Sequence, residues 1–230
     1  MAVQYSFGQI VTNGLVLALD AADRNSYPGS GTVWSDLSGN NNTGTLTNGP
    51  TFSSTNGGVI VFDGVDDYCI NSLSAGFTAA ITIVTIAKST NSTWNSYAGL
   101  GSARYNNGYI IHNNLSAVSV TNYLLDSSGN YNAVGTIIPS DIQNFNFYAL
   151  TTNGSNSHKS YLNGILVNFS NTSITRTNTG SPQSNYLALD STVGGRYTAM
   201  SIASHFIYNR ELTASEILQN YNAMRTRFNL

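Results

Sequence analysis

The sequence has 230 residues, of which 41% are hydrophobic and only 9% are charged, with a formal net charge of -2. A chain of this size can bury one core as a single β domain. Its few Lys and Arg are scattered, which argues against nucleic acid or an anionic membrane as partner, and no apolar run is long enough to cross a bilayer.

The chain begins MAVQYSFGQI, without the basic region and sustained apolar stretch of a secretory signal. We therefore expect synthesis in a cytoplasm. Cys69 is the single cysteine, so no disulfide can form within the chain, and a buried apolar thiol is expected at this position.

Short apolar runs separated by turn-forming residues recur along the chain, as in a sandwich or barrel. The expected strands cover 15–19, 59–62, 81–87, 108–112, 117–120, 145–150, 165–169, 186–189 and 201–208. In the run 81–87 apolar side chains alternate onto both faces, so both faces of that strand should be covered. Asn163 and Gly164 both tolerate positive φ and predict a tight type I′ hairpin.

Only the C-terminus changes to a helical period. Thr213 and Glu216 have the spacing of a capping box, in which each side chain satisfies a backbone amide of the first turn. An apolar stripe follows and is expected to pack on the core: Ile217, Leu218, Tyr221, Met224 and Phe228.

Four motifs occur in the order GLVLALDAAD, WSDLSGNNNTGTL, VFDGVDDY and HFIYNRELTASEI. In this order and spacing the sequence resembles the concanavalin A-like lectin/glucanase superfamily, in its laminin-G-like branch. The resemblance spans nearly the whole chain and implies an all-β fold, a two-sheet antiparallel jelly-roll sandwich with a short C-terminal helix. It also implies ligands on the concave sheet or at the loop rim, without fixing one activity. We assign 14–230 to the sandwich and 1–13 to an N-terminal attachment segment.

The sequence contains no set of residues suited to catalysis. Glycan hydrolysis with retention needs two carboxylates about 5 to 5.5 Å apart. Glu211 and Glu216 are the only two glutamates and both lie at the start of the helix, while Asp66 and Asp67 are adjacent and would point to opposite faces of a strand. No Gly-x-Ser-x-Gly elbow and no zinc spacing is present. We predict a protein that is not an enzyme.

Two oxygen-rich stretches are candidates for metal binding. DLSGNNNTG places Asp36, Ser38, Asn40 and Asn42 at alternate positions, and Asp36, Asn40 and Asn42 are the candidate calcium ligands. The alternative is a loop held by Asx-turns. In VFDGVDDY, Asp63 and Gly64 predict a turn whose exposed amides Asp66 or Asp67 can cap, and the alternative is a rim site in which Asp67 binds a metal or sugar hydroxyls.

Aromatic residues in polar surroundings suggest recognition by stacking on the apolar faces of sugars. The candidate ligand-binding residues are Trp94, Tyr97, Tyr105, Tyr123 and Tyr131. The alternative is that these tyrosines are ordinary residues of exposed strands.

These features favour a virion structural protein, either a capsid decoration or a fibre, with a lectin-like sandwich that binds glycans or a host surface. Phage proteins are made in the host cytoplasm and reach the virion surface without an export signal. The expected partners are other virion proteins or further copies of the chain, together with glycans. The alternative is a cellular lectin-like adhesin or a calcium-dependent carbohydrate-binding module.

Overall fold

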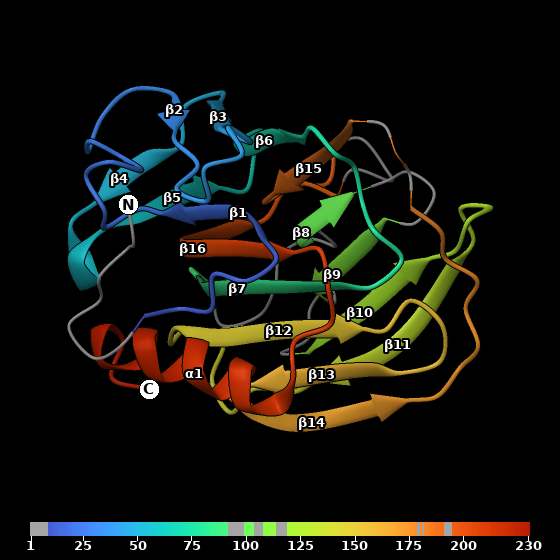
Figure 1. Ribbon diagram of the computed structural model, residues 1–230. Helices are drawn as coiled ribbons and strands as arrows, with labels where there is room; N and C mark the ends of the chain where they lie inside the picture. The colour runs from blue at the N-terminus through green and yellow to red at the C-terminus, as the bar shows by residue number, and fades with distance from the viewer. Residues whose placement is uncertain are drawn as a thin grey trace.

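The computed structural model describes residues 9–91, 99–103, 108–113, 119–178, 180, 182–190 and 195–230. One helix, α1 (Ala214–Met224), and two 3₁₀ turns, η1 (Thr55–Gly57) and η2 (Arg225–Arg227), accompany the strands (Figure 1). The strands are β1 (Leu15–Asp20), β2 (Val33–Trp34), β3 (Gly44–Thr47), β4 (Thr51–Ser53), β5 (Val59–Asp63), β6 (Tyr68–Leu73), β7 (Ile81–Ser89), β8 (Gly99–Ala103), β9 (Tyr109–Asn113), β10 (Val120–Leu125), β11 (Tyr131–Ile137), β12 (Asn146–Thr152), β13 (His158–Leu162), β14 (Ile165–Ser170), β15 (Gln183–Leu187) and β16 (Ala199–Tyr208).

The described strands form two antiparallel sheets. The first sheet has the order β14-β13-β12-β7-β16-β5-β4, with β1 also pairing with β16. The second sheet has the order β11-β10-β9-β8-β15-β6-β3-β2. The predicted all-β, two-sheet antiparallel sandwich with a short C-terminal helix is confirmed.

The clearest local predictions hold. Strand β7 is buried on both faces from Ile81 to Ala87, because its inner side meets the second sheet and its outer side meets α1 and neighbouring segments. Asn163 (φ 50°) and Gly164 (φ 78°) join β13 to β14 in the predicted hairpin. Positive φ at both central residues is what a type I′ turn requires.

Polar strands were harder to predict. The run expected at 117–120 corresponds to β10, which continues to Leu125, and the run expected at 186–189 to β15, which begins earlier. In both strands an asparagine points into the core, where Asn122 Nδ2 donates to Ser160 Oγ at 2.7 Å. Buried hydrogen-bonded amides are acceptable in a core, but they interrupt the apolar pattern that reveals a strand.

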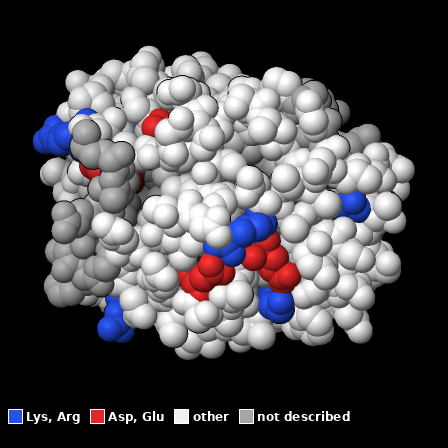
Figure 2. Space-filling model, viewed as in Figure 1, with Lys and Arg blue, Asp and Glu red and all other residues white. Residues whose placement is uncertain are grey.

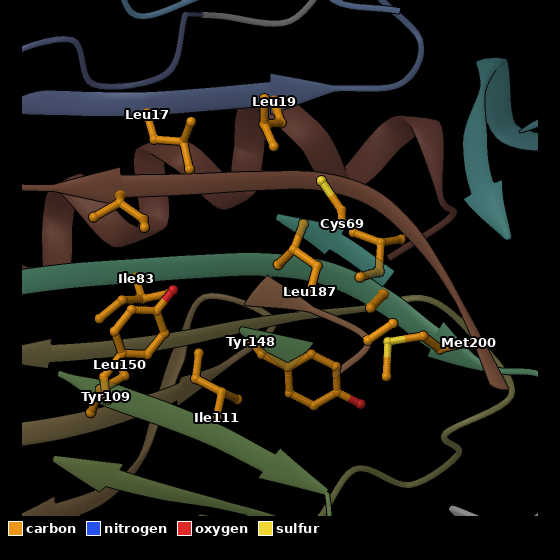
Figure 3. Close-up of a cluster of buried hydrophobic side chains, with 14 of the residues drawn as sticks. Leu17, Leu19, Cys69, Ile83, Tyr109, Ile111, Tyr148, Leu150, Leu187 and Met200 are labelled. Carbon is orange, nitrogen blue, oxygen red and sulfur yellow. The ribbon is translucent and has the colours of Figure 1, made fainter. Parts of the chain in front are cut away.

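The main core lies between the two sheets (Figure 3). Leu17, Ile83 and Leu150 of the first sheet face Ile111 and Leu187 of the second, and all five are fully buried. Cys69 belongs to this cluster as the predicted buried thiol, and burial raises its pKa to about 12. At such a pKa the thiol stays protonated and behaves as a small apolar group.

A second core covers the outer face of the first sheet. Phe147 and Phe206 of the sheet pack with Ile217 and Met224 of α1. The predicted capping box is present, with Thr213 accepting from the Glu216 amide and Glu216 accepting from the Thr213 amide. Leu218, predicted in the packed stripe, is instead 46% exposed. Leu218 lies at the margin of the stripe, and the polar Asn220 takes one of the four buried positions of the helix.

The residues before β1 are part of this second core. Ile10 and Val11 are buried against it, and Asn220 Oδ1 accepts from the Val11 amide at 2.8 Å. Tyr208 Oη donates to the Val11 carbonyl at 3.0 Å. The described part of the predicted attachment segment, 9–13, is therefore held on the sandwich. In the described ranges no helix is long and apolar enough to span a membrane.

Candidate functional site

The turn between β5 and β6 gathers three carboxylates. One oxygen each of Asp63, Asp66 and Asp67 lies within 4.8 Å of the others. Because β6 begins only at Tyr68, Asp66 and Asp67 belong to the turn and do not alternate as strand neighbours. The expectation that they point apart is wrong, and among the described residues these three form a group of carboxylates close enough to share one cation.

The same carboxylates also hold the turn together, as the structural alternative predicted. Asp67 Oδ2 accepts from the Asp63 amide at 3.0 Å, and Asp63 Oδ1 accepts from the Val65 amide at 2.8 Å. Burial raises the pKa of Asp67, the hydrogen bond from Asp63 opposes that shift, and repulsion from Asp63 and Asp66 adds to it. The turn thus favours a proton or another positive charge beside Asp67.

The loop predicted to bind calcium is folded around the Asp36 carboxylate. Its Oδ1 accepts from the amides of Ala18 (2.8 Å) and Ser38 (2.9 Å). Its Oδ2 accepts from Ser38 Oγ (2.7 Å) and the Asn42 amide (2.9 Å). The only charged group among the predicted calcium ligands therefore already accepts four hydrogen bonds.

The two asparagines of that loop act in a similar way. Asn42 is buried, with Nδ2 donating to the Val16 carbonyl at 2.7 Å and Oδ1 accepting from the Ser74 amide at 2.9 Å. Asn40 Nδ2 donates to the Leu15 carbonyl at 3.2 Å. These bonds match the Asx-turn alternative, and a calcium ion would have to displace several of them.

Two of the predicted aromatic residues lie on the outer face of the second sheet. Tyr123 on β10 pairs with Ile110 of β9 and with Ala133 of β11. Tyr131 lies on the edge strand β11 and pairs with Leu125 of β10. These pairs make the two tyrosines diagonal neighbours on one face. Tyr131 is 51% exposed, whereas Tyr123 is partly buried. The other three, Trp94, Tyr97 and Tyr105, lie outside the described residues.

The same face carries tyrosines that the sequence reasoning missed. The ring of Tyr68 lies 6.3 Å from that of Tyr186 and 6.3 Å from that of Tyr197, centroid to centroid. We call these three residues the tyrosine cluster. Their neighbours Cys69, Asn185 and Leu187 are fully buried on the inner side, so strand alternation turns Tyr68 and Tyr186 outward. The alternation in YCINSL and QSNYL is the signal that could have revealed them.

Hydroxyl side chains surround the tyrosine cluster. On the neighbouring strands Ser184 pairs with Ser72, and Tyr186 pairs with Ile70, which in turn pairs with Thr45. The outer face of this half of the sheet therefore combines partly exposed rings with alcohol groups. Rings can stack on the apolar side of a sugar while hydroxyls bond its alcohols.

The polar groups between the sheets are closed to solvent. His205 is fully buried, with Nδ1 beside Thr85 Oγ1 at 2.9 Å and Nε2 beside Tyr109 Oη at 3.3 Å. Burial lowers the pKa of His205 to about 3, so the imidazole is neutral near pH 7. Asn185 Nδ2 lies 3.3 Å from the same Nε2 and joins the second sheet to this group. A ligand cannot reach these residues without opening the sandwich.

No protein-family model matches the sequence, and no curated protein is similar to it in sequence. Solved structures do share its fold. The botulinum neurotoxin serotype D ligand binding domain in complex with N-acetylneuraminic acid has a TM-score of 0.66 at 15% identity, over 92% of this chain and 51% of that one. The botulinum neurotoxin serotype G binding domain has a TM-score of 0.69 at 15% identity, over 90% and 50%.

A third similar structure is the receptor binding domain of the botulinum neurotoxin C/D mosaic serotype, with a TM-score of 0.66 at 15% identity over 92% and 51% of the two chains. The chain spans about half the length of the structures it matches. At this identity the likeness is one of fold. It agrees with the β-sandwich and does not single out the laminin-G-like branch or a phage protein.

Proposed function

We propose that the chain is a non-enzymatic glycan-binding sandwich whose ligand lies on the tyrosine cluster. The observation that carries the proposal is the group of three partly exposed rings with 6.3 Å centroid separations, next to Thr45, Ser72 and Ser184. One similar solved structure was determined with N-acetylneuraminic acid, which supports sugar binding by this kind of sandwich.

The charges near the tyrosine cluster favour a neutral glycan. Asp67 directly precedes Tyr68, and the oxygens of Asp63 and Asp66 lie within 4.8 Å of its carboxylate. Beside Tyr197, the guanidinium of Arg196 is paired with Asp190 at 3.4 Å. A sugar carboxylate at this end would meet repulsion from several acidic groups, and the described cation beside Tyr197, Arg196, is already paired.

Calorimetric titration with neutral oligosaccharides and with oligosaccharides ending in N-acetylneuraminic acid tests the proposal. We expect neutral sugars to bind and Tyr186→Ala to weaken their affinity by about fivefold, since one stacking contact contributes about 1 kcal/mol. Tyr131→Ala, on the same face but at the sheet edge, is the matched control and should bind normally. Absence of binding, or an equal loss in both variants, would contradict the assignment.

Calcium-dependent binding is the alternative form of this function. It requires an ion at Asp36, Asn40 and Asn42, where the carboxylate already accepts four hydrogen bonds. An ion that binds only the folded chain raises the melting temperature by mass action. Equal melting temperatures in chelator and in excess calcium would remove this alternative, and a rise with calcium would support it.

We also propose that the sandwich acts at a virion surface, as a capsid decoration or fibre protein. The low charge and the polar Asn, Ser and Thr content of the chain support an exposed structural role. Mass spectrometry of purified particles, together with the gene neighbourhood, tests it. Absence from particles would favour the cellular lectin-like adhesin.

A further inference from the structure

The exposed apolar side chains of the sandwich concentrate on strand β14. Ile165 is 68% exposed, Leu166 48%, Val167 46% and Phe169 57%. These are four of the nine large apolar residues that are exposed in the described ranges, and they are almost consecutive. Scattered apolar residues are normal on a surface, but a contiguous group marks an interaction site.

Strand β14 is also a free edge. It ends the first sheet and pairs with β13 alone among the described strands. The second sheet ends on the same side with β11, where Tyr131 and nearby Ile138 are 51% and 70% exposed. An edge strand leaves backbone N–H and C=O groups available to a further strand.

The usual protection of an edge is weak here. The segment Ile165–Ser170 has the sequence ILVNFS, without a charged residue or a proline. The strand has one irregularity, a β-bulge. Tyr161 pairs with Leu166 and Ser160 with Asn168, so Val167 has no pairing partner on β13. That bulge sets Leu166 and Phe169 on one side of the sheet, the side of Tyr161 and α1.

The uncharged edge suits a second copy of the same strand. We propose that β14 pairs antiparallel with β14 of a second copy of this chain, about a two-fold axis. Such pairing is self-complementary, because every backbone donor that one copy presents meets the equivalent acceptor of the other. In a register centred between Val167 and Asn168, Leu166 of each copy would lie opposite Phe169 of the other copy.

Charge favours a second copy as well. Pairing of identical strands places like charges opposite each other wherever the strand carries any, and β14 carries none. The neighbouring Lys159 is already paired with Glu211 at 2.6 Å. Figure 2 agrees, since the charged side chains in that view form small groups and the lower margin, where β14 lies in Figure 1, is largely uncharged.

Sedimentation of the full chain over a concentration series tests this inference. We expect twice the 24.6 kDa chain mass, and a monomer for Val167→Lys with an unchanged circular dichroism spectrum and melting temperature. Val33→Lys is the matched control, because Val33 is 55% exposed on β2, the edge strand at the other end of the second sheet. It should remain dimeric.

A monomer at all concentrations would overturn the inference, as would a dimer that survives Val167→Lys. Loss of the dimer in Val33→Lys alone would place the interface at the opposite edge and would equally contradict it. A second variant, Phe169→Lys, tests the same strand independently of the bulge. The outcome does not depend on glycan binding, so this inference and the proposed function fail separately.

Discussion

The two sheets present opposite kinds of outer face. On the first sheet the outward residues are apolar, such as Val84, Phe147 and Phe206, and they are fully buried under α1 and the segment before β1. On the second sheet the outward residues include Tyr68 and Tyr186, which stay partly exposed. Strand alternation is the same in both sheets, and the chemistry of the outward positions decides which face is covered by the fold and which face stays partly open to solvent.

Removal of residues 213–230 should have the largest effect on the covered face. The deletion exposes the outer side of the first sheet and loses the burial of Ile217, Met224 and Phe228, each contributing about 1.5 to 3 kcal/mol. It also loses the Asn220 bond to Val11. Because a whole domain is stabilised by only about 5 to 15 kcal/mol, the truncated chain should not fold. Circular dichroism checks this, and an unchanged melting temperature would show that the cover is dispensable.

Arg227→Leu should have the next largest effect. The guanidinium donates to Asp20 Oδ1, the Asn56 carbonyl and the Gly58 carbonyl, each at 2.7 Å, and Asp20 is buried. Removing one partner of a buried ion pair costs about 3 to 5 kcal/mol, because the other charge stays buried. Arg225→Leu is the matched control and should change stability little, since that residue is exposed. Urea denaturation of both variants measures the difference.

The difference between the faces also explains what the sequence could predict. The helix cap at Thr213 and Glu216 and the turn at Asn163 and Gly164 depend on local chemistry, so their prediction succeeded. The tyrosine cluster was missed because Tyr68, Tyr186 and Tyr197 come from separate segments that only strand pairing brings together. The tyrosines predicted to bind a ligand were chosen because polar residues flank them in the sequence. Such flanking residues do not indicate which strands become neighbours in the sheet.

The carboxylates between β5 and β6 depend on tertiary structure in the same way. Asp66 and Asp67 were treated as strand residues, and their true geometry depends on where β6 begins. Strand ends are set by tertiary pairing and are the least predictable feature of a sequence. At Asp36, by contrast, the predicted Asx-turn alternative is visible in local hydrogen bonds to Ser38 and Asn42.

The interior that joins the two sheets should make stability depend on pH. Burial holds the pKa of His205 at about 3, against about 6.5 in the unfolded chain, so the unfolded state binds the proton more readily. Stability present above pH 6.5 is therefore lost as the pH falls toward 3, by up to about 1.4 kcal/mol per pH unit. In His205→Gln this slope should be shallower, and His158 serves as an internal reference because both proteins keep it. Equal slopes in both proteins would contradict the assignment.

The smallest effect on stability should come from a substitution on the outer face of the second sheet. The size of that effect distinguishes a structural role from a role in ligand binding. Phe206→Ala on the covered face should cost about 3 to 5 kcal/mol, because it leaves a cavity under α1. Tyr186→Ala removes a partly exposed ring whose contact with Tyr68 contributes about 1 kcal/mol, and solvent fills the space. Thermal melting of the two variants measures both quantities. A large loss in Tyr186→Ala would mean that the tyrosine cluster is a third core and not a surface for a ligand. A small loss of stability together with a loss of glycan binding would assign the ring to recognition, because aromatic side chains left open to water contribute little to the fold that carries them.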